Sequence, residues 1–185
     1  MNKRIFLTLT AALALQLVAS AQSKYMTRNA YVRFFSTTPV ENIEAINNQT
    51  SSVFDAATGK IVFQVPIKGF QFEKALMQEH FNENYLESDK IPNATFNGEV
   101  KGMPAMEALK DKEVQVHLVG TLTIHGVEQL VDEVFVMTVV DGQLRLQGTF
   151  SVSPEDYKIA IPSAVTDKIA ERIEVSVKAA YTQKS

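Results

Sequence analysis

The sequence predicts an all-β domain built from antiparallel strands. Three observations predict it: long segments in which apolar and polar residues alternate, turn-forming dipeptides between those segments, and little helical periodicity. Alternation with a period of two is typical of strands that face an apolar interior on one side and water on the other. Alternation alone does not choose between a sandwich and a closed barrel. Closure removes exposed strand edges, and a short helix serves a barrel more naturally, as a plug or lid.

The first element is a secretory signal peptide over residues 1–21. It consists of a basic head (Lys3 and Arg4), an apolar run, and the small residues Ala19-Ser20-Ala21. The apolar run is shorter than the roughly 18 to 20 residues that a membrane-spanning helix needs. Cleavage after the last alanine leaves residues 22–185 as one domain that is periplasmic or secreted.

Composition narrows the classes of function for this domain. The chain holds 21 acidic residues against 18 basic ones, two of which leave with the signal peptide, so nucleic acid is not an expected partner. It has no cysteine, which excludes disulfide bonds, thiol catalysis, cysteine-based metal sites and a lipidated cysteine. Stability therefore has to come from packing.

Four segments show the alternation most clearly, and each is long for a strand. With apolar side chains recurring at every second position, they cover residues 60–68, 114–124, 144–152 and 173–181. The alternation indicates that one face of each of these strands is turned to the interior.

Two dipeptides mark the turns between strands. Asp141-Gly142 favours a two-residue hairpin, because both residues accept a positive φ, and it should join residues 127–140 to 143–152 as an antiparallel pair. His125-Gly126 marks another tight connection, from residues 114–124 to 127–140. Three consecutive strands are therefore expected to form a meander.

One segment breaks the alternation and predicts a short amphipathic helix over residues 73–86. Its larger side chains recur at three- and four-residue spacing, as in Leu76, Met77, His80, Phe81, Asn84 and Tyr85. The segment around Pro92 ends it. A second short helical piece is expected over residues 164–172, after Pro162.

Two stretches carry a resemblance to a known family. The first contains Phe70-Gln-Phe72, His80-Phe81-Asn82, Tyr85-Leu-Glu-Ser88 and Ile91-Pro92-Asn-Ala94-Thr95-Phe96-Asn97-Gly98. The second is Gly120-Thr-Leu-Thr-Ile-His-Gly-Val127. In content and spacing these stretches resemble the YceI-like family, and the resemblance extends over about residues 53–181.

The resemblance implies a lipocalin-like antiparallel β-barrel of about eight strands with one or two short helices. It also implies a periplasmic or secreted protein, and the better understood members of the family hold a long polyisoprenoid in the barrel. Two departures put the ligand in question more than the fold. Where the family commonly has Arg-Asp-x-His-Leu, this chain has Gln78-Glu-His80-Phe81 without the Arg-Asp pair, and Ala30-Tyr-Val-Arg-Phe-Phe-Ser36 replaces an Asp-x-x-His-Ser opening.

A long apolar ligand is bound by removing its surface from water, at roughly 0.8 kcal/mol per buried methylene, and needs only an apolar lining. The same side chains would equally fill a solid core, so alternation leaves a hollow and a filled barrel open, and the resemblance favours the hollow one. The alternation predicts that some side chains face the interior and bind the ligand: Phe63, Val65, Leu118, Leu122, Ile124, Leu146 and Phe150. The helical segment and the residues before it add Phe72, Met77 and Phe81 at the mouth.

Catalysis finds little support in the sequence. His117 lies on the polar, outward side of its strand with Gln115 and Thr121, and His125 lies in a turn. His80 has no second histidine at metal-ligand spacing. A Gly-x-Ser-x-Gly elbow and a phosphate-binding glycine loop are both absent from the sequence. We therefore expect a non-enzymatic protein without cofactor or metal that binds a polyisoprenoid or similar lipid. The alternatives are a surface interaction or stress-related module with a filled barrel and, less favoured, an uncharacterised hydrolase. Transient membrane contact and a homodimer stay open.

Overall fold

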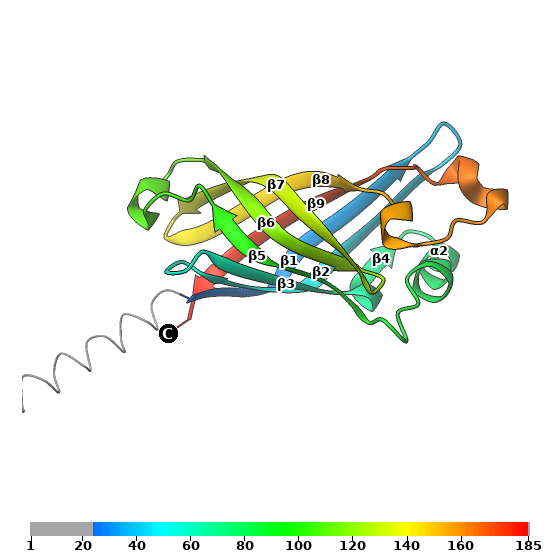
Figure 1. Ribbon diagram of the computed structural model, residues 1–185, viewed down its shortest axis with the longest axis horizontal. Coiled ribbons are helices and arrows are strands. Elements are labelled where there is room, and N and C mark those ends of the chain that lie inside the picture. Colours follow the sequence, from blue (N-terminus) through cyan, green and yellow to red (C-terminus); the bar gives the residue numbers. More distant parts are fainter. Residues whose placement is uncertain (1–23, 185) are drawn as a thin grey trace, which may run out of the picture.

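The computed structural model describes residues 24–184, which form one antiparallel sheet closed into a barrel (Figure 1). The predicted signal peptide lies outside the described residues. The strands are β1 (Lys24–Thr37), β2 (Asn42–Asp55), β3 (Lys60–Pro66), β4 (Phe70–Phe72), β5 (Asn93–Lys101), β6 (Val114–Ile124), β7 (Val127–Val140), β8 (Gln143–Val152) and β9 (Ile173–Gln183).

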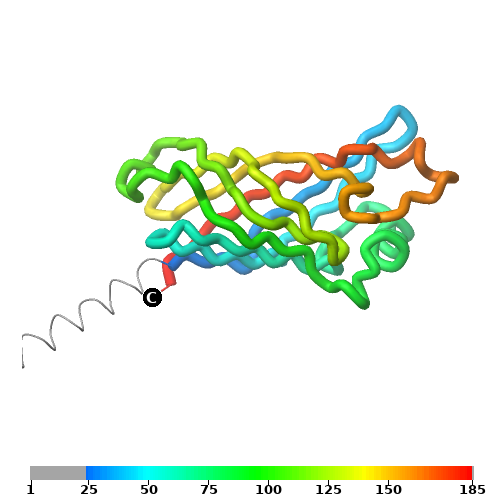
Figure 2. Tube along the Cα trace, in the orientation of Figure 1, coloured from blue at the N-terminus to red at the C-terminus, as the bar shows by residue number. Residues whose placement is uncertain are grey.

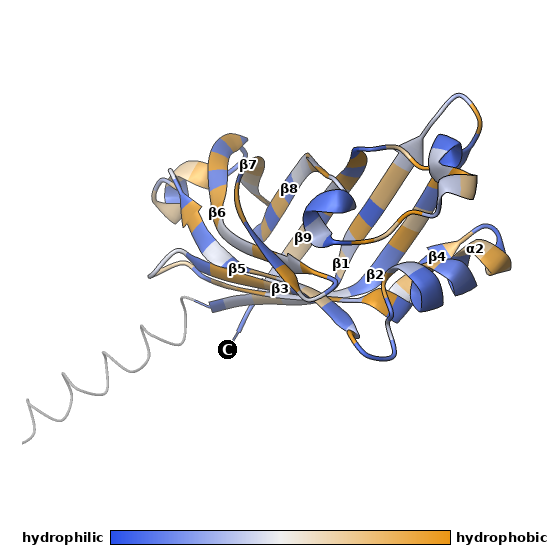
Figure 3. Cartoon of the chain, turned by 45° about the vertical axis from the view of Figure 1, so that its right-hand side comes forward, coloured by the Kyte–Doolittle hydropathy of each residue, from blue (hydrophilic) through white to orange (hydrophobic). Residues whose placement is uncertain are grey.

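Eight of these strands make the barrel wall. Their order is β1-β9-β8-β7-β6-β5-β3-β2, and pairing of β1 with β2 closes the ring, while the three-residue β4 pairs with β2 farther along the edge that β3 uses. The prediction of an antiparallel barrel of about eight strands is confirmed. Figure 3 shows apolar and polar residues alternating along the strands, as a wall with an apolar inner face requires.

The predicted meander of β6, β7 and β8 is also confirmed. β6 pairs with β7 from Ile124 opposite Val127 onward, and β7 pairs with β8 from Val140 opposite Gln143. Both turns use positive φ angles, 51° and 73° at His125-Gly126 and 52° and 75° at Asp141-Gly142.

Short helices occupy the connections. The predicted helix over residues 73–86 is present as α2 (Ala75–His80), which continues as a π-helical turn, η2 (Phe81–Tyr85). The piece expected over residues 164–172 is a 3₁₀-helix, η5 (Ser163–Lys168). Further 3₁₀ turns are η1 (Ile67–Gly69), η3 (Met106–Leu109) and η4 (Glu155–Tyr157). Among the described residues, none of the helices is long and apolar enough to cross a membrane.

β2 is a strand that the alternation did not reveal, because polar residues occupy its buried positions. Asn47, Thr50 and Ser52 are all buried there. The Asn47 amide donates to the backbone oxygen of Pro66 at 2.8 Å, and its Oδ1 accepts the Gln49 N–H at 2.7 Å. The ladder between β1 and β2 shifts register nearby, so Asn47 satisfies backbone groups where the strand is irregular.

The two ends of the barrel differ. At one end the interior is filled by large buried side chains, among them Phe54, Met137, Leu144 and Tyr181, and the η3 loop inserts the fully buried Leu109 among them. The Tyr181 hydroxyl lies 2.8 Å from Ser52 Oγ, so even the buried polar atoms there are paired. This end is closed.

Two long connections gather at the opposite end. Figure 2 shows the α2–η2 segment and the segment between β8 and β9, residues 153–172, at the same end of the barrel, away from η3. The β1–β2 hairpin loop and the His125-Gly126 turn lie at this end too (Figure 1). This end carries the site described next.

Candidate functional site

A cavity of about 520 Å³ occupies the half of the barrel that faces α2–η2. Its floor is formed by one inward side chain from each of six strands: Val32, Phe63, Phe96, Leu118, Phe135 and Val177. The next inward residues on these strands, such as Ala30, Ile61 and Met137, belong to the filled end and do not line the cavity. The barrel is therefore hollow above this floor and solid below it.

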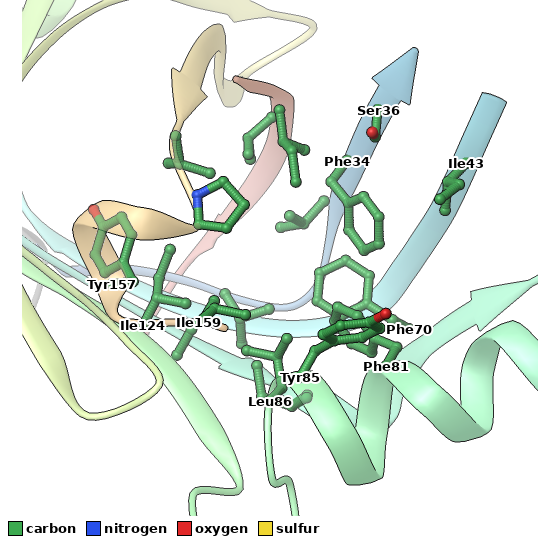
Figure 4. A pocket seen from close by; sticks show the side chains of 18 of the residues that line it. Phe34, Ser36, Ile43, Phe70, Phe81, Tyr85, Leu86, Ile124, Tyr157 and Ile159 are labelled. Atoms are coloured by element: carbon green, nitrogen blue, oxygen red, sulfur yellow. The ribbon is translucent and has the colours of Figure 1, made fainter. Parts of the chain in front are cut away.

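One wall of the cavity is an aromatic cluster of Phe34, Phe70, Phe72 and Phe81. Figure 4 shows Phe34, Phe70 and Phe81 of this cluster. Phe34 comes from β1, Phe70 and Phe72 come from β4, and Phe81 begins η2. The ring centroid of Phe34 lies 5.3 Å from that of Phe81, and Phe72 lies 5.0 Å from Phe81, distances at which aromatic rings attract one another. The cluster fixes the π-helical turn against the barrel mouth.

The opposite wall uses the segment between β8 and β9. The ladder between β7 and β8 stops at Phe135 opposite Gly148, so the two strands are unpaired towards the mouth. Tyr157 and Ile159 come from the segment that follows β8, and they line the cavity facing Ile124 (Figure 4). Two hydrogen bonds hold the segment in place: Gln129 Nε2 donates to the backbone oxygen of Asp156 at 2.7 Å, and the Ala170 N–H donates to Ser36 Oγ at 2.9 Å.

Nine of the ten side chains nominated from the sequence line this cavity: Phe63, Val65, Phe72, Met77, Phe81, Leu118, Leu122, Ile124 and Phe150. Leu146 does not. It pairs with Met137 and Ala179 and is buried in the filled end, so the structure places it outside the cavity where the sequence had predicted a lining residue. Alternation assigns a side chain to the inner face, but not to a height along the barrel axis. Ligand contact by the other nine stays a prediction.

Sequence reasoning missed lining residues on several elements, among them two groups. The first comes from β1 and β2, where Val32, Phe34 and Ile43 line the cavity. The second comes from the β8–β9 connection, whose apolar residues recur without a strand pattern: Ile159, Ile161, Val165 and Ile169. The inner face of β7 could have been found, since Val131, Phe135 and Met137 alternate within a strand that the turns had already predicted.

The ionisable side chains that line the cavity differ in their surroundings. Lys74 Nζ lies 2.9 Å from Glu41 Oε1, an ion pair at the mouth that joins the start of α2 to the β1–β2 hairpin. Glu133 lies on β7 among apolar neighbours. Burial raises the pKa of its carboxyl, the charge of Asp132 raises it further, and Arg172 opposes both.

Tyr157 lies in the same region of the cavity. Burial raises the pKa of its phenol to about 12, and the charges of Asp156 and Glu133 add to the effect. The phenol therefore keeps its proton and can donate a hydrogen bond at physiological pH.

The three histidines lie in different parts of the barrel and do not form one catalytic group. His117 faces outward and pairs with Asp132 at 2.6 Å, and His125 Nε2 pairs with Glu87 at 3.2 Å beside the β6–β7 turn. His80 lies on α2 at the exposed mouth. Within residues 24–184, no three histidine, aspartate or glutamate side chains are arranged to hold a metal ion. The geometry of the described residues can bind an apolar molecule by burial.

Comparison with known proteins gives a family and a fold. The model of a family described as "YceI-like domain" matches residues 21–181, which is most of the chain. No protein with a curated description matches the sequence.

Among solved structures, a polyisoprenoid binding domain from Saccharophagus degradans, implicated in plant cell wall breakdown, superposes with a TM-score of 0.74 at 13% identity, covering 88% of this chain and 99% of that one. BcnA of Burkholderia cenocepacia gives 0.69 at 14% identity, covering 83% and 96%. The YceI protein of Campylobacter jejuni gives 0.58 at 16% identity, covering 78% and 86%. These similarities show a shared fold.

Proposed function

This chain belongs to the YceI-like family, and from that premise we propose that it binds and carries one long-chain apolar ligand, a polyisoprenoid or related lipid, inside its barrel. The observation that carries the proposal is the cavity of about 520 Å³, apolar on nearly all its walls and closed at its floor. A volume of this size is typical of pockets that hold one small molecule. The similar Saccharophagus degradans structure is that of a polyisoprenoid binding domain, which supports the same choice of ligand.

The physical basis is burial. Each methylene removed from water contributes about 0.8 kcal/mol, so ten of them contribute about 8 kcal/mol before the cost of association. Aromatic rings and flexible side chains such as Met77 can adapt to an irregular chain. The binding is non-catalytic in this proposal, because the walls that a bound lipid would meet are largely apolar.

The proposal places the protein outside the cytoplasm, in the periplasm or secreted. It rests on the basic head, apolar run and Ala-Ser-Ala site of residues 1–21. A domain there works without ATP, and passive carriage of a water-insoluble molecule requires none.

The test begins with the mature protein isolated from the periplasmic or culture fraction of its native host. Its intact mass should correspond to a chain that starts at Gln22, and extraction with organic solvent should release a lipid that mass spectrometry identifies. A protein that keeps residues 1–21 in the cytoplasm contradicts the location. Absence of lipid in the extract, with no uptake of an added polyprenol, contradicts carriage.

A matched pair of variants shows whether the ligand lies in the cavity. Leu122→Asp places a charge on the cavity wall, whereas Leu130→Asp makes the same change at an outer position of β7 that is 89% exposed. We expect the first to lower affinity for 1-N-phenylnaphthylamine, an apolar fluorescent probe, more than tenfold and the second to leave it unchanged. Circular dichroism checks that both variants fold. Equal affinities in the two variants would place binding elsewhere.

A further inference from the structure

Glu133 places a half-buried carboxylate on the wall of the apolar cavity. It pairs across the β6–β7 ladder with Leu118, and both side chains line the cavity. The next inward residue of β7, Phe135, is part of the floor, and the one after it, Met137, is fully buried in the filled end. Glu133 therefore lies one inward position above the floor on β7.

The carboxylate has no partner of its own. The other lining carboxylate, Glu41, is paired with Lys74. For Glu133, no hydrogen bond or ion pair is found within residues 24–184. Arg172 acts on it only as a charge, since its guanidinium donates to the backbone oxygen of Ser151 at 3.4 Å.

Charges of both signs act on Glu133 from outside the cavity. Asp132 precedes it on β7 and pairs with the outward-facing His117, and Arg172 has the opposite effect on its pKa. An anionic end brought to the carboxylate itself would meet a like charge in a half-buried place, where repulsion is stronger than in water. A hydrocarbon terminus would cover the carboxylate without giving it a hydrogen bond, which also costs free energy.

We propose that Glu133 accepts a hydrogen bond from the inner end of the ligand, so that the cavity selects long-chain molecules that end in a hydrogen-bond donor, a hydroxyl or an amine, over those that end in an anion. The chain of the ligand then runs from Glu133 past the aromatic cluster towards the mouth. The inference rests on the proposed function, because it describes the polar end of the molecule that the cavity carries.

The experiment compares four ligands that share a twelve-carbon chain and differ at one end. Dodecanol and dodecylamine carry donors, methyl dodecanoate carries acceptors only, and dodecanoate is an anion. Each displaces 1-N-phenylnaphthylamine from delipidated mature protein at pH 7.5. We expect the two donors to bind about tenfold more tightly than the ester, and dodecanoate to bind more weakly than the ester. The separate values for dodecanol and dodecylamine distinguish a hydroxyl from an amine as the source of the donor.

Glu133→Gln removes the charge and keeps the shape, and it should bring the four affinities to within about threefold of one another. Glu128→Gln makes the same change at an exposed position of β7 outside the cavity and should keep the wild-type order. If the order is the same in wild type and in Glu133→Gln, or if dodecanoate binds wild type as tightly as dodecanol, the role of Glu133 is refuted while carriage stands. If none of the four displaces the probe from wild type, the proposed function itself fails.

Discussion

Glu133 links the charge of one residue to the stability of the barrel. Burial raises the pKa of its carboxyl in the folded protein, whereas in the unfolded chain that pKa is ordinary. A raised carboxyl pKa means that the folded state binds the proton more tightly than the unfolded state. The contribution to the free energy of unfolding is therefore fully present below the ordinary pKa and is lost as the pH rises through the folded value.

Glu133→Gln should remove this pH-dependent loss. At pH 7.5 we expect the variant to melt about 1–3 °C above wild type, and at pH 4 most of that gain should disappear. Thermal melts followed by circular dichroism at the two pH values measure the difference. Glu128→Gln controls for the loss of an exposed carboxylate and should show a similar small change at both pH values. A gain for Glu133→Gln that is as large at pH 4 as at pH 7.5 would contradict the assignment.

At the scale of single residues, the sequence could not predict the depth of a side chain, which is its position along the barrel axis. Leu146 and Phe150 share one strand and one phase of the alternation, yet Phe150 lines the cavity and Leu146 is buried in the filled end. Their difference depends on what fills the interior at each height, and Leu109 and Tyr181 arrive there from distant parts of the chain. The inner face is a local property of a strand, whereas depth depends on the closed barrel.

Among the elements, the strands divide into those that alternation reveals and those it hides. β3, β6, β8 and β9 alternate apolar with polar residues and were predicted. β2 was hidden because its buried positions hold Asn47, Thr50 and Ser52, whose polar atoms are satisfied by contacts that only the folded chain supplies. The tight turns were predictable because their φ requirements are local.

The cavity floor depends on two glycines, Gly148 and Gly98, because neither has a side chain. The ring of Phe135 lies across Gly148 of β8, where an added Cβ would stand 2.6 Å from Cδ1 and Cγ of the ring. The ring of Phe96 lies across Gly98 in the same way, 2.5 Å from the position of such a Cβ. Glycine at these inward positions lets aromatic rings lie flat over the strand and form a floor.

Gly148→Ala should therefore force the Phe135 ring out of place. We expect a loss of about 1–3 kcal/mol in the free energy of unfolding, as in other overpacked cores. Phe135→Leu removes the ring and should make the added methyl tolerable, so a double-mutant cycle by urea denaturation should give a coupling energy of about 1 kcal/mol or more. Simple additivity of the two changes would show that the ring and the glycine do not interact.

At the scale of the whole molecule, the barrel separates stability from binding along its axis. The filled end packs its side chains as a core does, with paired buried hydroxyls and η3 as a plug. The open end instead encloses a cavity of about 520 Å³, and α2–η2 and the β8–β9 segment form part of the wall around it. A small closed barrel has room for either side chains or one ligand, and this one uses each half differently.

Two alanine-to-phenylalanine changes test this division directly. Ala179→Phe adds a ring to the filled end, where Ala179 is buried opposite Leu146, and should lower the free energy of unfolding by about 1–3 kcal/mol or more. Ala94→Phe adds the same ring to the cavity wall, where space is available, and should change stability little while lowering affinity for 1-N-phenylnaphthylamine more than tenfold. Urea denaturation and probe titration measure the two quantities on each protein. Because the two substitutions are chemically identical, a difference between their effects has to come from the half of the barrel in which each one lies. An Ala94→Phe protein that binds the probe normally would mean that ligands do not bind in the cavity.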